Sequence, residues 1–319
     1  MLEMKKITAL TLSVLLLFSL ASCDKKSANE KVTGEKDNRP SVTQTQKKDK
    51  KVIKGANTGT DETFTGFKPL EKRNFTVSDP DNSRGLSTEK ICHSFGVAKD
   101  GEANDISKNA QKYFDEKNFD AVTLDTVTKK KVLYLTFDCG YENGYTMKIL
   151  DVLKEKNVPA AFFCTLHEME QNPDIIARAI NDGHIVGNHT NTHPSMDEIS
   201  RTQMTDEIKA FDDYLREHFG YSALYFRFPK GEYSDCALDL VSSLGYTSVF
   251  WSLAYSDWDL DNQKGKDYAV ETVSARFHPG AVILLHSISP DNAAALPEII
   301  DKAREQGYEF RALTQLPER

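Results

Sequence analysis

The feature that most constrains the fold is an alternation of short apolar runs with amphipathic stretches, from Lys131 to near the C-terminus. Short apolar runs bounded by turn residues predict buried strands, and strands that alternate with helices predict a parallel sheet covered by helices. The seven runs are residues 132–137, 160–165, 184–187, 224–227, 247–251, 281–285 and 308–310.

Between these runs, apolar residues recur at spacings of three and four, which indicates amphipathic helices. Two such sets are Tyr145, Ile149, Val152 and Leu153, and Met204, Ile208, Phe211, Tyr214 and Leu215. Seven strands fit a closed or nearly closed barrel better than a flat, doubly wound sheet. We therefore predict an α/β fold in residues 131–316, a distorted (β/α)7-type barrel of parallel strands with outer helices. In such barrels the active site gathers at the C-terminal ends of the strands.

The first 23 residues have the features of a bacterial lipoprotein signal peptide. Lys5 and Lys6 precede an apolar run at residues 7–21 that is short for a membrane span, and small residues lead into Cys23. This order resembles a lipobox, in which the cysteine is lipidated; the alternative is an ordinary secretory signal with an incidental Cys23. Both interpretations place the folded part outside the cytoplasm, and the first predicts a lipid anchor in the bacterial cell membrane.

Two further segments precede the predicted barrel. Residues 24–84 are rich in Lys, Asn, Thr and Asp and hold too little apolar surface to fold, so we predict a disordered linker. Residues 85–130 contain apolar side chains suited to packing and are predicted to be an N-terminal extension on the barrel. The formal net charge is −8 and the folded part has no basic stripe, which argues against a nucleic-acid partner. No protein partner is predicted.

Candidate catalytic residues stand at the ends of the predicted strands. The first strand ends in Asp138, where a carboxylate suits catalysis; an aspartate that caps the next helix is the alternative. The third strand is followed by His189 and His193, whose spacing would place both imidazoles on one face of a helical turn. There they can hold one divalent cation. For this motif alone, a surface histidine pair is the alternative.

The other strand ends supply an arginine, aromatic residues and another imidazole. Arg227 can clamp a carboxylate through its planar guanidinium, or form an ordinary salt bridge. The fifth strand leads to Asp257 and Trp258. Aromatic rings around a cleft are a usual surface for sugar rings, and the alternative is that the tryptophan is ordinary core material. The sixth strand ends in His286, for which a hydrogen-bonded core histidine is the alternative. Together these ends hold the residue types of a metal-dependent hydrolase with an acid and a base.

In order and spacing these blocks resemble the polysaccharide deacetylases, the NodB-homology group also called carbohydrate esterase family four. The resemblance covers about residues 131–316. The segments 141–144 (Tyr-Glu-Asn-Gly) and 93–96 (His-Ser-Phe-Gly) look like the subgroup that deacetylates N-acetylmuramic acid in peptidoglycan. That subgroup is associated with muramic δ-lactam formation in the spore cortex, and hence with sporulation. The resemblance implies a hydrolase that cleaves the amide bond of N-acetyl groups on peptidoglycan strands.

The resemblance also implies roles for individual residues. Asp138 would be the general base, and Arg227 would orient it through a salt bridge. His189 and His193 would bind a divalent metal cation, for which zinc is expected. Such a cation lowers the pKa of water and polarises the acetyl carbonyl.

The remaining roles concern the acid and the substrate pocket. His286 would be the general acid, with Asp257 as its partner carboxylate. Leu284 and Trp258 would wall the small pocket for the acetyl methyl group. The backbone N–H of Lys230 would help to hold the oxyanion.

Cys139 departs from the family pattern, since most members have a second aspartate there as the third metal ligand. A Cys139 thiolate would be a sound zinc ligand. In the alternative, Cys139 is a small buried residue that does not bind, and waters complete a two-histidine site. A disulfide framework is not expected, because Cys92, Cys139, Cys164 and Cys236 are widely spaced in a large domain.

The other histidines are placed outside the site. His184 opens a strand and is expected to be structural, whereas His167, His218 and His278 lie in loops or at helix ends without a partner motif.

Two rival functions stay open. One is an enzyme of the same family that acts on N-acetylglucosamine polymers or on a small amide. The other is a lipoprotein that binds wall glycan and has lost catalytic activity. In that case, the replacement of the usual aspartate by Cys139 would reflect the loss.

Overall fold

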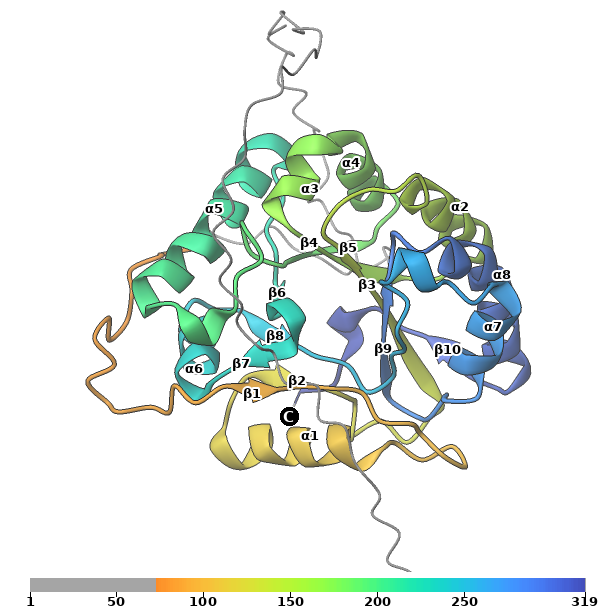
Figure 1. The fold of residues 1–319 in the computed structure, drawn as a ribbon, viewed down its shortest axis with the longest axis horizontal. Helices are drawn as coiled ribbons and strands as arrows, with labels where there is room; N and C mark the ends of the chain where they lie inside the picture. The colour runs from red at the N-terminus through yellow and green to blue at the C-terminus, as the bar shows by residue number, and fades with distance from the viewer. Residues whose placement is uncertain (1–72, 319) are drawn as a thin grey trace, which may run out of the picture. The chain divides into compact units, whose positions relative to one another are not determined.

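The computed structural model describes residues 73–318 (Figure 1). The predicted signal peptide, the lipidation site Cys23 and the predicted linker up to residue 72 lie outside the described residues. In the described part, no helix combines the length and the apolar character that a membrane crossing requires.

An eight-stranded sheet forms the centre of the described fold, in the order β10-β3-β4-β5-β6-β8-β2, with β9 also paired to β3. Every pair in this sheet is parallel. Its strands are β2 (Ala121–Val122), β3 (Val132–Cys139), β4 (Ala160–Cys164), β5 (Ile185–Asn188), β6 (Tyr225–Phe226), β8 (Thr247–Val249), β9 (Ala281–His286) and β10 (Glu309–Phe310). Seven of these coincide with the predicted strands; β2 was not predicted.

The sheet curls until its two sides approach each other. Leu253, after β8, bridges Ile283 of β9 in parallel, and Leu124, after β2, bridges Ala281. Figure 1 shows the strands around a common centre with the larger helices outside them. The helices are α1 (Asp105–Lys117), α2 (Thr146–Lys156), α3 (Leu166–Gln171), α4 (Pro173–Asn181), α5 (Arg201–Phe219), α6 (Asp235–Ser243), α7 (Lys266–Ser274) and α8 (Pro290–Glu305). This arrangement confirms the predicted parallel barrel with outer helices.

Strand β3 shows why its residues form a central strand. Both faces are buried, and successive side chains point to opposite faces. Leu133, Leu135 and Phe137 join the core beneath the helices, whereas Val132 and Tyr134 join the smaller core inside the sheet. An apolar run without alternation is the pattern of a strand covered on both sides.

Helix α5 likewise follows from its sequence. Ser200 caps its first turn in a capping box with Gln203, and Gly220 ends it in the left-handed conformation. The predicted apolar positions, such as Ile208 and Phe211, are fully buried against the sheet.

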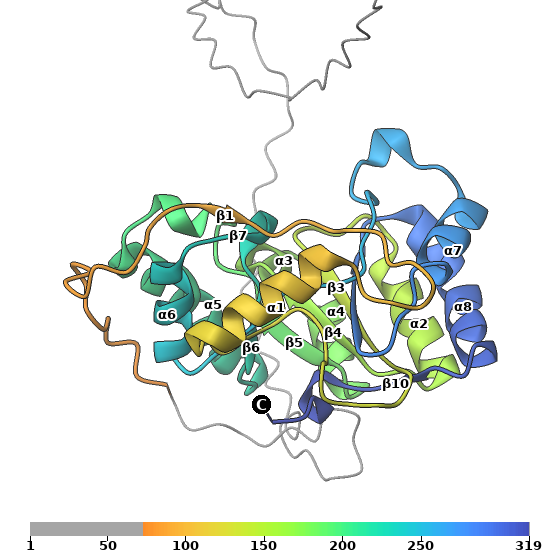
Figure 2. The same ribbon diagram turned by 90° about the horizontal axis from the view of Figure 1, so that it is seen from below.

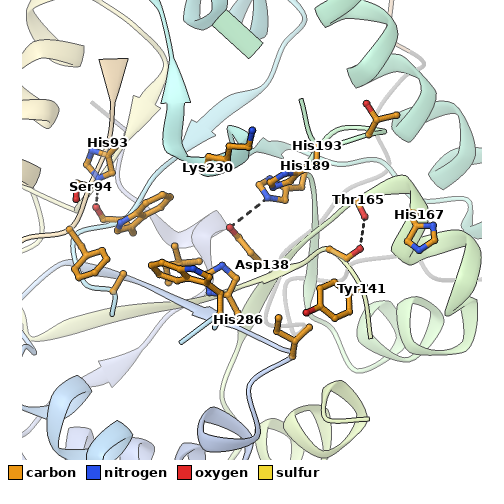
Figure 3. Close-up of a pocket in the computed structure, with 18 of the residues that line it drawn as sticks. His93, Ser94, Asp138, Tyr141, Thr165, His167, His189, His193, Lys230 and His286 are labelled. Atoms are coloured by element: carbon orange, nitrogen blue, oxygen red, sulfur yellow. Dashed lines mark hydrogen bonds and ion pairs between the residues drawn. The ribbon is translucent and has the colours of Figure 1, made fainter. Parts of the chain in front are cut away.

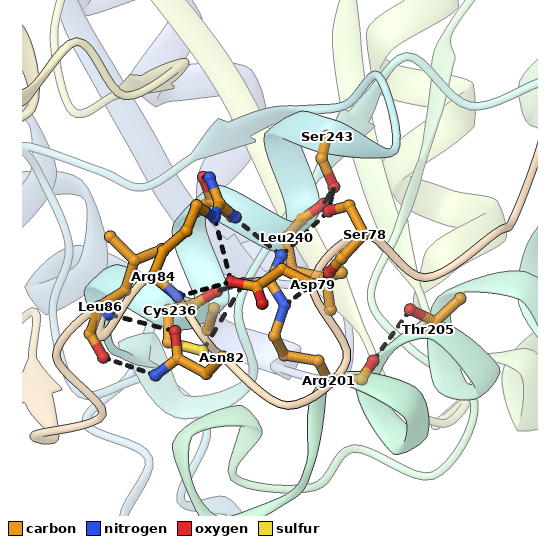
Figure 4. Close-up of polar contacts among 12 residues, drawn as sticks. Ser78, Asp79, Asn82, Arg84, Leu86, Arg201, Thr205, Cys236, Leu240 and Ser243 are labelled. Atoms are coloured by element: carbon orange, nitrogen blue, oxygen red, sulfur yellow. Dashed lines mark hydrogen bonds and ion pairs between the residues drawn. The ribbon is translucent and has the colours of Figure 1, made fainter.

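Residues 73–84 correct the predicted linker, which was assigned to residues 24–84. Phe75 and Val77 are half-buried against the core, and the Arg73 guanidinium donates to the Ala223 carbonyl at 2.5 Å. Nearby, Arg201 of α5 donates to the carbonyl oxygens of Ser78 and Cys236 at 2.9 and 2.8 Å (Figure 4). Few apolar residues anchor this segment, and specific arginine contacts hold it, which composition does not reveal.

The predicted N-terminal extension, residues 85–130, is part of the barrel as well as a layer on it. Its strand β1 (Ile91–Cys92) pairs antiparallel with β7 (Glu232–Tyr233), and β2 pairs with β8. Figure 2 shows α1 running along the outside of the strands. The predicted boundary at residue 131 is therefore too late, because the two residues of β2 are too short a run to be recognised.

Candidate active site

A cavity of about 920 Å³ opens at the C-terminal ends of the barrel strands (Figure 3). Its lining residues are His93, Ser94, Phe95, Asp138, Gly140, Tyr141, Thr165, His167, His189, Asn191, Thr192, His193, Lys230, Trp251, Ala254, Trp258, Leu284, His286 and Ile288. Of the predicted site residues, Arg227, Asp257 and Cys139 are absent from this lining. Arg227 and Asp257 lie behind the lining, where Arg227 pairs with Asp138 and Asp257 pairs with His286.

Asp138 is held by a buried ion pair at the end of β3. Arg227 Nη1 lies 2.7 Å from Asp138 Oδ1, and Arg227 is itself fully buried. The guanidinium also donates to Thr136 Oγ1 at 2.9 Å and to the Val249 carbonyl at 2.9 Å. Burial raises the pKa of Asp138, but the charge of Arg227 outweighs it, aided by His189, and the net pKa is lowered. The helix-cap alternative is wrong, because α2 begins at Thr146 and it is Glu142, not Asp138, that accepts from the Thr146 N–H.

His189 and His193 lie together, with ring centroids 4.8 Å apart, but not on a helical turn as the spacing predicts. The segment after β5 is a loop in which Thr190 and His193 adopt φ values of 71° and 59°. Asn188 Oδ1 accepts from the Thr190 N–H at 2.9 Å, and Thr190 Oγ1 accepts from the His193 N–H at 2.9 Å. These local side-chain hydrogen bonds replace helical ones and bring the imidazoles together.

The orientation of His189 is set by the chain that carries Arg227. Its Nδ1 lies 2.8 Å from the Arg227 carbonyl oxygen, which accepts a hydrogen bond, so that Nδ1 carries the proton. Nε2 is therefore the unprotonated nitrogen, and it lies 3.7 Å from Asp138 Oδ2.

His286 pairs with a buried carboxylate on the opposite side of the cavity from the histidine pair. Its Nδ1 lies 2.7 Å from Asp257 Oδ1, and its backbone N–H donates to Asp257 Oδ2 at 2.7 Å. Asn292 donates to the same carboxylate at 2.5 Å. Burial by itself lowers the pKa of His286, but the charge and hydrogen bond of Asp257 outweigh it, and the net pKa is raised. His286 is thus no ordinary core histidine: its ring faces the cavity.

The protonation state of His189 and His193 suits the binding of a metal ion. Burial lowers the pKa of His189, and burial together with His189 lowers the pKa of His193 to about 4. Both rings are neutral near pH 7, which is the form that binds metals. Within residues 73–318, however, no three His, Cys, Asp or Glu side chains converge as a metal-binding group. The residues fit a site with two protein nitrogens and room for further oxygen ligands.

Cys139 lies away from this cavity, which corrects its assignment as a possible metal ligand. It is buried in the core beneath the helices with Leu135 and Phe137, and it lies opposite Cys164 in the β3–β4 register. The physical reason is the alternation of β3: Asp138 points into the barrel, so its neighbour points outward. The structure agrees with the alternative, in which Cys139 is a small buried residue that does not bind the metal.

Sequence reasoning missed several lining residues, above all His93. This residue follows β1, is buried, and its Nε2 lies 2.7 Å from the Trp251 carbonyl oxygen. A Cβ on Gly231 would lie 2.7 Å from the His93 carbonyl oxygen, so this glycine allows the N-terminal segment to reach the cavity. The segment 93–96 carried the family resemblance, and that signal could have placed His93 in the site.

Among the other histidines, His167 corrects the prediction, since it lines the rim of the cavity. His184 is buried beside Phe162, as expected of a structural residue. His218 stacks on Tyr214, with ring centroids 3.8 Å apart, and His278 lies 2.9 Å from Ser252 Oγ.

Comparison with known proteins shows the family. Residues 125–249 match the family model of polysaccharide deacetylases. The peptidoglycan-N-acetylmuramic acid deacetylase PdaA of Bacillus subtilis is 44% identical over 199 residues, which span 62% of this chain and 75% of PdaA. This chain belongs to the polysaccharide deacetylase family.

Other polysaccharide deacetylases agree with this assignment. The structure of Bacillus subtilis PdaA, described as a family 4 carbohydrate esterase, superposes with a TM-score of 0.69 at 39% identity. That match covers 72% of this chain and 98% of the solved one. A peptidoglycan-N-acetylglucosamine deacetylase of Bacillus cereus is 33% identical over 193 residues, or 59% of this chain and 68% of the relative. Family 4 carbohydrate esterases are in general metal-dependent hydrolases of N-acetyl groups.

Proposed function

We propose that this polysaccharide deacetylase removes N-acetyl groups from peptidoglycan strands, with N-acetylmuramic acid as its sugar. The observation that carries the proposal is the convergence of three units on one cavity: the Asp138–Arg227 ion pair, the His189–His193 pair and the His286–Asp257 pair. The similarity to PdaA, a deacetylase named for N-acetylmuramic acid, supports the choice of sugar.

In the proposed reaction, Asp138 acts as the general base and accepts a proton from the attacking water. Its buried pairing with Arg227 keeps the carboxylate ionised and fixes its direction. A divalent cation bound by His189 and His193, with zinc proposed because both ligands are imidazoles, would polarise the acetyl carbonyl and lower the pKa of water.

His286 acts as the general acid, because an amine leaves poorly unless it is protonated. Asp257 holds the imidazole in place and favours its protonated form. Trp258 and Leu284, which both line the cavity, wall the place of the acetyl methyl group. The backbone N–H of Lys230 serves as an oxyanion donor.

The proposed setting is the outer side of the bacterial cell membrane, with the chain anchored through a lipid on Cys23 and acting during sporulation. The order of Lys5, Lys6, the apolar run and Cys23 supports the anchor, and the resemblance of segments 93–96 and 141–144 to the muramic subgroup supports the link to sporulation.

A second candidate substrate is an N-acetylglucosamine polymer, because the Bacillus cereus relative is named for N-acetylglucosamine. A non-catalytic wall-binding role is not proposed, since the carboxylate–arginine and imidazole–carboxylate pairs are both intact.

The test is acetate release from purified glycan strands by the wild-type protein and by Asp138→Asn and His286→Ala. Each variant is expected to lose at least a hundredfold in kcat, as removal of a general base or acid typically does. His218→Ala, which lies at the end of α5 outside the cavity lining, is the matched control. Full turnover by both site variants would contradict the mechanism, and absence of acetate release by the wild-type protein would contradict the function.

A further inference from the structure

One side chain in the cavity has a charge that the proposed reaction does not use. Lys230 is the only Lys or Arg among the lining residues of the described part, and its side chain is exposed to the cavity. Its Nζ donates to Ser195 Oγ at 3.2 Å, and no carboxylate oxygen of residues 73–318 lies within 4.0 Å of it.

The acidic residue next along the chain from this lysine has other partners. Glu232 accepts from Ser195 Oγ at 2.5 Å and lies 3.4 Å from Lys90 Nζ. Lys90 also pairs with Glu198 at 2.9 Å. The Lys230 ammonium therefore reaches Glu232 only through the Ser195 hydroxyl, and no carboxylate of residues 73–318 is in direct contact with it.

The backbone at Lys230 favours a functional use of its side chain. Its φ and ψ are 58° and 4°, in the left-handed region that costs a non-glycine residue about 1–2 kcal/mol. The turn is held from both sides, by the buried Arg227 and by Gly231 against the His93 carbonyl. Strain of this kind in an over-determined turn points to a purpose for the side chain that it presents.

The position of the Lys230 ammonium suits a contact with the lactyl group of N-acetylmuramic acid. Figure 3 shows the Lys230 side chain near His189 and His193, which line the same cavity. The ammonium is therefore on the side of the cavity where the proposed metal would hold the acetamide. In N-acetylmuramic acid, the acetamide is on C2 and the lactyl ether is on O3 of the same ring. The lactyl carboxylate is thus only a few bonds from the bond to be cleaved.

Resting on the proposed function, we propose that the Lys230 ammonium binds the lactyl carboxylate and so determines specificity for N-acetylmuramic acid. N-acetylglucosamine has a neutral hydroxyl on C3, and a lactyl group in amide linkage is neutral as well. Neither offers the ammonium an anion. A hydrogen bond between charged groups in a partly enclosed site is worth enough for roughly a tenfold or larger preference.

The test compares three glycans: strands with free lactyl carboxylates, the same strands with these carboxylates converted to methyl amides, and N-acetylglucosamine oligomers. The wild-type protein is expected to prefer the carboxylate strands by roughly tenfold or more in kcat/KM. Lys230→Met keeps the length of the side chain without its charge, and should lose the preference, so that its ratio of kcat/KM on carboxylate strands to kcat/KM on methyl amide strands falls to about 1 through KM. Lys230→Arg should retain the preference.

Lys90→Met is the matched control, because it removes a lysine from the same Glu232 network but not from the cavity. It should behave as the wild-type protein does. Higher salt should weaken the preference of the wild-type protein for carboxylate strands, whereas the ratio measured for Lys230→Met should not change with salt. The inference is overturned if the wild-type protein does not distinguish carboxylate from methyl amide, or if Lys230→Met loses activity equally on both. These outcomes differ from failure of the proposed function, in which no strand releases acetate.

Discussion

Arg227 Nη1 lies 2.7 Å from Asp138 Oδ1, and both side chains are withdrawn from solvent at the base of the cavity. The pair joins β6 and β8 to β3, because the same guanidinium also donates to the Val249 carbonyl and to Thr136. The ion pair therefore both stabilises the barrel and orients the Asp138 carboxylate, the proposed general base.

Replacement of Arg227 by Met should lower the free energy of unfolding by about 3–5 kcal/mol, since it leaves a buried carboxylate without its partner. Urea denaturation near pH 7 measures this loss. The double variant Asp138→Asn/Arg227→Met should be less destabilised than the sum of the two single variants. Additive losses would show that the two side chains do not stabilise each other.

Replacement of Asp257 by Asn should move the alkaline limit of activity to lower pH. The acid must be protonated to act, and Asp257 raises the pKa of His286, so the active form persists to higher pH in the wild-type protein. The stability of the fold should depend on pH in the same direction. The His286–Asp257 pair stabilises the folded state fully below the pKa of histidine in the unfolded chain, about 6.5, and this stabilisation is lost as the pH rises through the raised pKa of His286 in the folded protein.

Profiles of kcat against pH measure the shift of that limit. Asp261→Asn, in the exposed turn after Trp258, is the matched control and should leave the profile unchanged. An unmoved alkaline limb in Asp257→Asn would argue against His286 as the acid.

Replacement of Gly231 by Ala should reduce both stability and activity. The new Cβ would lie 2.7 Å from the His93 carbonyl and 2.8 Å from the Trp251 ring, at a φ of 69°. We expect a loss of about 1–3 kcal/mol and a displaced His93. Gly307→Ala has a similar φ of 82° with nothing within 4 Å, and so isolates the conformational cost. Thermal unfolding of both variants separates the steric effect of the new Cβ from the conformational cost of a positive φ. Equal losses of stability would mean that the structure relaxes around the Cβ at position 231 without a cost in free energy.

Replacement of Cys139 by Ala should leave the metal content of the purified protein unchanged, because this thiol lies in the core beneath the helices. His193→Ala should lose most of the metal, since it removes one of two imidazoles. Elemental analysis after dialysis against a weak chelator distinguishes the variants. If Cys139→Ala lost metal as His193→Ala does, Cys139 would have to turn into the cavity in the loaded protein.

The sequence by itself determined the strands and the residue types at their ends, because both are local properties. The apolar runs 132–137 and 281–285 predict β3 and β9, and therefore place Asp138 and His286 at one end of the barrel. Since parallel strands deliver their C-terminal residues to the same edge, the placement of Asp138 and His286 at one end follows from this pattern, whereas their register as direct neighbours comes from the pairing of β3 with β9 in the closed sheet.

Only the tertiary structure decided the contacts between segments far apart in the chain. His93 reaches the cavity because β1 pairs with β7, and Gly231 leaves it room. His189 and His193 meet through a loop of side-chain hydrogen bonds, which residue spacing does not encode. Cys139 is excluded because the two-residue period of a strand turns it away from Asp138. Packing between distant segments and the direction of each side chain are set by the whole barrel, so no local pattern reports them.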